Sequence, residues 1–164
     1  MTNKWEVKWD KKVKALDQER TVRNLFILIS ENSDNDDEII AFLQDFPKLK
    51  PIVNAIPPQN QYEESMLMWA VWRLKTKVVD ALVKAGAEVN YRTTQNESVA
   101  TYWDDERIGK SEQAMIKACQ IVRMLEKAHA KLDRDADDST CIVKRAKERN
   151  LVDLVETLQA LGYK

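Results

Sequence analysis

The sequence predicts an all-α fold, built as an array of paired helices. Apolar residues recur at three- and four-residue steps along most of the 164-residue chain. Glycine and proline are scarce, with 3 and 4 copies, whereas a β-sandwich or a disordered linker normally uses more of both. A related pattern begins at Ser65 and again 33 residues later at Ser98, which indicates a repeat architecture.

Residues 3–19 are predicted to form one helix, because apolar residues recur at helical spacing with Lys and Asp between them. These apolar residues are Trp5, Trp9, Val13 and Leu16. We expect the stripe to pack on the first repeat as a terminal cap, since each end of a solenoid exposes an apolar face. The alternative is an amphipathic helix that binds a partner.

Residues 21–47 are predicted to form a degenerate first repeat, with two apolar helices around a polar, acidic break. Pro47 ends the second of these helices. The segment 48–64 is expected to be a connector, whose extended Pro57-Pro58 pair leads into a hairpin tip.

Residues 65–90 carry the clearest unit, two short helical patterns closed by Gly86, Ala87 and Asn90. A third unit is predicted at 98–133. Its extra length is placed at 104–113, as a loop or a lengthened helix, with Ser111 as the cap of the helix that follows. A fourth unit is predicted at 139–162.

The unit 65–90 resembles an ankyrin repeat, in which a TPLHxAA segment, an IVxxLL segment and a GAxxN loop follow one another. This resemblance implies an ankyrin-like helical-hairpin solenoid of about four repeats with an N-terminal capping helix, forming a single domain over residues 1–164. Several family positions differ. The TPLH segment reads SMLM, SVAT and CIVK, and loop glycines are replaced by Leu74, His129 and Asn150. These losses predict an irregular array, and a non-ankyrin helical-hairpin array is the alternative fold.

Composition limits the classes of partner. The chain has 26 basic and 27 acidic side chains, a net charge of −1, which argues against a general nucleic-acid grip. No apolar run is long enough to span a membrane, so no membrane partner is expected. Cys119 and Cys141 lie in apolar helical patterns and are predicted to be buried, reduced thiols, which indicates a cytoplasmic protein.

The sequence offers no clear catalytic group, metal site or cofactor motif, and none is expected. His129 is the one histidine, placed by the repeat pattern in a turn. The acidic run 133–138 lacks the central glycine and the closing glutamate of a calcium loop. The 3 glycines form no phosphate-binding loop.

The resemblance also implies a binding scaffold, whose hairpin tips and first helices line a concave groove. Trp72 and Arg73 occupy positions that normally face this groove, although Trp72 could instead pack on the insertion or on the first repeat. The expected partner-binding residues are Tyr62, Glu64, Trp72, Arg73, Arg92, Gln95, Glu97, Tyr102, Trp103 and Asp105.

The expected function is protein–protein interaction, as an adaptor or inhibitor that covers a surface of its partner. Short divergent ankyrin proteins resemble secreted bacterial effectors, which are delivered into host cells, and immunity proteins that neutralise toxins. Self-association through the groove is also open. The alternative is a helical enzyme or small-ligand-binding domain around His129 and Glu126.

Overall fold

The computed structural model describes residues 4–31, 33–44, 50–57, 60–103, 105–131 and 142–163, with backbone alone at 4–16, 101, 105, 142 and 145. The described helices are α1 (Lys4–Ser30), α2 (Asp36–Gln44), α3 (Lys50–Val53), α4 (Met66–Trp72), α5 (Thr76–Lys84), the 3-10 turn η1 (Val99–Thr101), α6 (Asp105–Lys110), α7 (Glu112–Lys127), α8 (Ile142–Glu148) and α9 (Val152–Ala160). The described residues hold no strand beyond one isolated antiparallel bridge, Arg92–Ser98. The all-α prediction is confirmed for this part of the chain.

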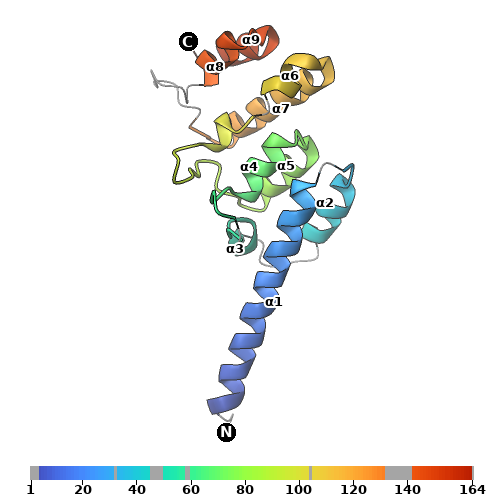
Figure 1. Ribbon diagram of the computed structural model, residues 1–164, viewed down its shortest axis with the longest axis vertical. Helices are drawn as coiled ribbons and strands as arrows, with labels where there is room; N and C mark the ends of the chain where they lie inside the picture. Colours follow the sequence, from blue (N-terminus) through green and yellow to red (C-terminus); the bar gives the residue numbers. More distant parts are fainter. Residues whose placement is uncertain are drawn as a thin grey trace.

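The helices stack as pairs in chain order (Figure 1). One row runs through α2, α5, α7 and α9, each packed against the next. On the other side α1 packs against α4, and α4 against η1. Among the described loops, this arrangement brings the break before α2 beside the turn between α4 and α5.

Helix α1 is continuous from Lys4 to Ser30, so the prediction of separate helices at 3–19 and from 21 onward is wrong. The first proline of the chain is Pro47 and the first glycine Gly86, so nothing in this segment breaks a helix. The C-terminal part of α1 is buried through Val22, Leu25 and Ile29. Its N-terminal part extends away from the stacked helices (Figure 1).

The predicted capping stripe is not placed by this structure. The side chains of Trp5, Trp9, Val13 and Leu16 lie outside the described residues. What the backbone does establish is that this segment prolongs α1 rather than folding back as a separate helix.

Three helices of the row end in the same way, each with a left-handed residue directly after its last turn. These residues are Gly86 (φ 90°), His129 (φ 62°) and Gly162 (φ 87°). In each case the next backbone N–H donates to a carbonyl five residues earlier, at 2.9–3.0 Å: Ala87 to Leu82, Ala130 to Leu125 and Tyr163 to Leu158. This is the Schellman arrangement, and His129 adopts it without glycine's freedom.

The turn inside a pair is also repeated. Leu74 (φ 54°) and Asn150 (φ 55°) take left-handed conformations where the pattern would favour glycine. The following residues, Lys75 and Leu151, donate their N–H to Ala70 and Ala146 respectively. The replaced glycines therefore leave the tight turns intact, and the predicted irregularity does not arise at these two turns.

Asparagine side chains link successive units through one shared arrangement. Asn54 donates to the carbonyl of Gly86 at 2.9 Å and accepts from the N–H of Glu88 at 2.7 Å. Asn90 donates to the carbonyl of His129 at 3.4 Å and accepts from the N–H of Lys131 at 2.5 Å. In two consecutive units, an asparagine amide thus makes the same two hydrogen bonds to equivalent positions of the following loop.

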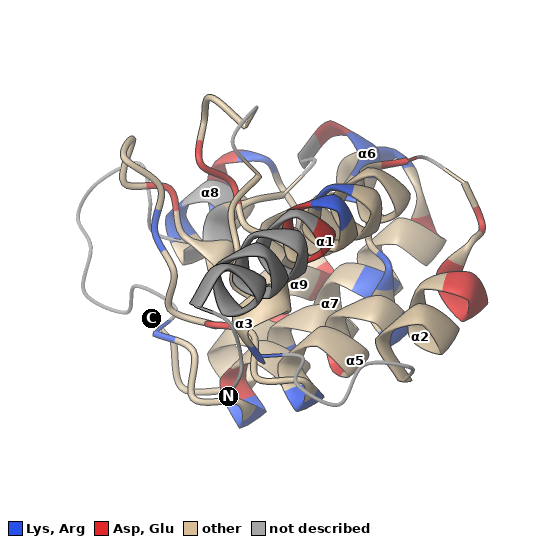
Figure 2. Cartoon of the chain, turned by 90° about the horizontal axis from the view of Figure 1, so that it is seen from below, with Lys and Arg blue, Asp and Glu red and all other residues tan. Residues whose placement is uncertain are grey.

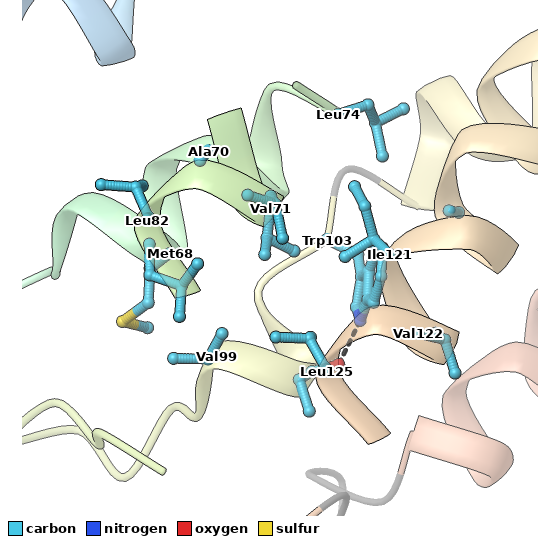
Figure 3. Close-up of a cluster of buried hydrophobic side chains, with 14 of the residues drawn as sticks. Met68, Ala70, Val71, Leu74, Leu82, Val99, Trp103, Ile121, Val122 and Leu125 are labelled. Atoms are coloured by element: carbon cyan, nitrogen blue, oxygen red, sulfur yellow. Dashed lines mark hydrogen bonds between the residues drawn. The ribbon is translucent and has the colours of Figure 1, made fainter. Parts of the chain in front are cut away.

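The core runs the length of the stack. Its central part is shown in Figure 3, where side chains of α4, α5, η1 and α7 interdigitate. The predicted insertion belongs to this core: residues 105–110 form α6, which buries Ile108. Ser111 caps the following helix by accepting from the N–H of Ala114 at 3.2 Å, which confirms the predicted cap.

One lysine is buried between two pairs. Lys75 is 6% exposed, and its ammonium donates to the carbonyl of Ser33 and the side chain of Asn35, both at 2.7 Å. A third bond joins it to the Asp36 carboxylate at 3.2 Å. The polar break before α2 is therefore held against the turn that precedes α5.

Candidate functional site

A hollow of about 400 Å³ lies between α1, the loop before α4 and Trp69 of α4. Its lining is formed by Arg23, Phe26, Ile27, Pro57, Asn60, Gln61, Tyr62, Glu64 and Trp69. Two of the exposed large apolar side chains of the described chain border it: Ile27, 46% exposed, and Tyr62, 50% exposed. This hollow, with its rim, is the candidate site.

The floor of the hollow is fixed by the start of α4. Ser65 caps this helix, its hydroxyl accepting from the N–H of Met68 at 3.2 Å, and the preceding residue, Glu64, is thereby turned inward. The Glu64 carboxylate, with the residue only 8% exposed, accepts from the Trp69 indole at 3.1 Å and from the Tyr102 hydroxyl. The Glu64 carboxylate is therefore hydrogen-bonded within the protein.

The tyrosine on Glu64 is held protonated. Burial, followed by the hydrogen bond to Glu64, raises the pKa of Tyr102 well above its usual value. A neutral hydroxyl is the form that donates to the carboxylate. The hydrogen bond from Tyr102 therefore holds the Glu64 carboxylate in place beside the Trp69 indole.

The Trp69 ring forms one wall of the hollow. Its ring meets Phe26 of α1 edge-on, with centroids 6.0 Å apart and planes at 74°. The Arg73 guanidinium lies over Trp69 at 5.5 Å and donates to the carbonyl of Ser30 at 2.8 Å. Arg73, which is predicted to bind a partner, thus joins the end of α1 to α4 in this structure.

Trp72 is half-buried and stacks on Tyr102, with centroids 5.5 Å apart and planes at 47°. It does not line the hollow. The ring contact fits the packing alternative for Trp72, while its partial exposure leaves it at the margin of the candidate site.

The predicted loop residues form a second, adjoining surface. Arg92 donates to the Asn96 carbonyl at 2.9 Å, and Gln95 and Glu97 are exposed. The Tyr91 hydroxyl donates to the Glu63 carbonyl at 2.7 Å, which places this loop beside the one that carries Tyr62. The loop before α4 and the loop before η1 therefore lie side by side.

The prediction that Trp103 lines the groove is wrong. Trp103 is 4% exposed and its indole donates to the carbonyl of Ala100, so it belongs to the core (Figure 3). The short η1 turn directs the ring inward against α7, where Ile121 lies. Asp105 begins α6, and its side chain lies outside the described residues.

The sequence reasoning missed the α1 side of the hollow. Residues 25–29 are all apolar, and consecutive residues on a helix point around its whole circumference. They therefore cannot all face one core, and Ile27 is the one left exposed while Leu25 and Ile29 are fully buried. The apolar run 25–29 was therefore the feature of the sequence that could have indicated an exposed apolar residue on this helix.

Charge is spread in both signs over the described elements (Figure 2). The acidic residues at the start of α2 are the clearest cluster, and Asp36 within it pairs with Lys75. None of the described helices is both long enough and apolar enough to cross a bilayer. Within the described ranges, no group of three or more His, Cys, Asp or Glu side chains is placed to hold a metal ion.

The histidine considered for catalysis lies at the surface. His129 is exposed in the turn after α7, and its backbone carbonyl accepts from Asn90. The acidic run 133–138 and Cys141 lie outside the described residues. The other cysteine, Cys119, is buried in α7, as expected.

Comparison with known proteins assigns no family to this chain. The sequence matches no protein-family model, and no curated protein is significantly similar to it. The interpretation of the candidate site therefore depends on the geometry of the hollow and of the loops beside it.

Proposed function

We propose that the chain is a protein-interaction module, a divergent ankyrin-type array that binds a partner through the hollow and the adjoining loop tips. The repeated helix ends at Gly86, His129 and Gly162 support the repeat assignment. The paired brackets made by Asn54 and Asn90 support it further, because they join consecutive units at the same loop positions. Repeat arrays of this kind act as binding scaffolds.

The observation that carries the proposal is the exposure of Ile27 and Tyr62 at the rim of an apolar hollow. Arg23 and Trp69 join them there. Arg, Tyr and Trp are the residue types that dominate binding energy at protein interfaces. A rim that combines these residues around a cavity is suited to take an anchoring side chain of a partner.

The mode of action that fits such a site is occlusion: the module covers an active or docking surface of the partner. This serves an adaptor or an inhibitor. A bacterial effector delivered into a host cell and a toxin-neutralising immunity protein both use this mode. Neither role requires a catalytic group or a cofactor, and the cytoplasm is the proposed site of action.

Affinity capture tests the proposal with three versions of the chain: wild type, Ile27→Asp and Ile116→Asp. Ile116 lies on α7 and is 50% exposed, against 46% for Ile27, so it is a matched control away from the hollow. We expect a partner that wild type and Ile116→Asp retain and Ile27→Asp loses. Equal retention by all three versions would remove the hollow from the interface.

A further inference from the structure

We infer that the hollow recognises a peptide segment of the partner that presents one bulky apolar side chain with a carboxylate next to it. This inference rests on the proposed function and names the chemistry of its partner. It follows from the shape of the hollow, from Arg23, the cation among the described residues that line it, and from two polar side chains of the loop.

The shape favours a single anchoring side chain. A volume of about 400 Å³ lies near the lower end of the range for ligand pockets. Its walls are the rings of Phe26, Tyr62 and Trp69 with the side chains of Ile27 and Pro57. An aromatic or branched aliphatic side chain fits within such a space, and the polar backbone of its peptide would then lie at the rim.

The charge at the rim of the hollow determines which type of residue can lie next to the anchoring side chain of the partner. Among the described residues, the lining of the hollow includes one basic and one acidic side chain, Arg23 and Glu64. Glu64 is buried and already accepts from Trp69 and Tyr102. Arg23 is exposed and makes no hydrogen bond or ion pair to the described residues. The positive charge of Arg23 is therefore without a partner among the described residues, and a carboxylate on the bound segment would pair with it.

The position of the carboxylate follows from the two sides of the hollow. Arg23 lies on the α1 side, whereas the exposed Glu63 follows Tyr62 on the loop side. A carboxylate beside α1 approaches Arg23 and stays clear of Glu63. A cation in the same place would face Arg23 and be repelled.

The loop supplies polar groups for the peptide backbone. Gln61 is exposed, as is the Tyr62 ring, and neither side chain bonds to the described residues. Asn60, in contrast, is used internally, donating to the Glu64 carbonyl at 2.6 Å. The Gln61 amide and the Tyr62 hydroxyl are thus the groups available to orient a bound segment.

The test uses capped dipeptides as probes with the isotope-labelled full chain: N-acetyl-phenylalanyl-glutamate amide, its glutamine analogue and its alanyl-glutamate analogue. The readout is the shift of the Trp69 indole N–H signal on titration. We expect saturable binding of the first probe, about two- to fivefold weaker binding of the glutamine probe and at least about tenfold weaker binding of the alanyl probe.

Two matched arginine variants decide the role of the cation. Arg23→Gln should abolish the preference for glutamate over glutamine, and Arg20→Gln, which is also exposed but lies outside the lining, should keep it. The inference is overturned if wild type shows no preference, if Arg23→Gln preserves it, or if no probe shifts the Trp69 signal. If the capture experiment with Ile27→Asp still loses a partner in those cases, the docking site stands and only its chemistry is wrong.

Discussion

Replacing Lys75 by methionine removes one ammonium from the centre of a polar junction and keeps most of its apolar stem. The ammonium has three partners, on Ser33, Asn35 and Asp36, at 2.7, 2.7 and 3.2 Å. Lys75→Met leaves the Asp36 carboxylate, whose side chain is 19% exposed, without its cation.

The size of the loss follows from the burial of the pair. Removing one partner of a fully buried ion pair costs about 3–5 kcal/mol. Water reaches part of Asp36 and recovers some of this, so we expect the free energy of unfolding to fall by about 2–4 kcal/mol. With a urea dependence of about 2 kcal/mol per molar, the midpoint should fall by about 1–2 M.

The assay is urea unfolding followed by far-ultraviolet circular dichroism, with Lys77→Met as the matched control. Lys77 pairs with Asp37 at 3.4 Å, but the two side chains are 66% and 90% exposed, so its loss should cost less than about 1 kcal/mol. Asp36→Asn in both backgrounds should show coupling to Lys75 alone. If Lys75→Met costs no more than Lys77→Met, the reasoning from burial is refuted.

Two further predictions concern the backbone at Gly86 and the half-buried Tyr102. Gly86→Val should lower the free energy of unfolding by about 1–3 kcal/mol, because φ is 90° and a new Cβ would lie 3.3 Å from the Lys50 side chain; in Gly109→Ala, at an ordinary φ, the loss should be absent, and equal effects in urea unfolding would contradict this. For Tyr102, a pKa raised on folding means that the folded state holds the proton more tightly, so the stability it supplies is complete below the ordinary tyrosine pKa of about 10 and declines as the pH rises beyond it. The stability of wild type relative to Tyr102→Phe should therefore fall above that pH, and a constant difference across the alkaline range would argue against the buried hydrogen bond to Glu64.

The sequence predicted best where a local rule determines the structure. Ser111 was predicted to cap a helix, and its hydroxyl accepts the N–H of Ala114, whereas the cap that Ser65 forms on α4 was not predicted. Ser111 was named as a cap from sequence, and Ser65 marked the start of its unit. Gly86 was predicted to close its unit, and it has the positive φ that glycine adopts readily. Each of these features depends on residues within a few positions along the chain.

Prediction failed where the outcome depends on which surfaces meet. Trp103 was placed in a groove, yet its ring is buried because η1 and α6 turn the chain over α7. Glu64 was predicted to bind a partner, yet it is buried, and its carboxylate accepts hydrogen bonds from Trp69 and from Tyr102, which is 38 residues away. Helical periodicity gives the face of each helix and does not give the neighbour that covers it.

The α1 side of the hollow lay between these cases. The apolar run 25–29 required that some residue be exposed, and its position toward Tyr62 depended on the connector 48–64, whose α3 was not expected.

Polar tracts were also misjudged. The acidic break before α2 reads as a solvated loop, but Lys75 draws Ser33, Asn35 and Asp36 into a shared junction.

Site-specific photocrosslinking tests the central claim, that the hollow is the surface that meets a partner, most directly. A benzophenone side chain is introduced at position 27 in one version of the chain and at position 116 in another, and both are irradiated in living cells. The account predicts one discrete adduct with another protein from position 27 and none from position 116. The same adducts from both positions, no adduct from position 27, or an adduct only with a second copy of this chain would contradict it.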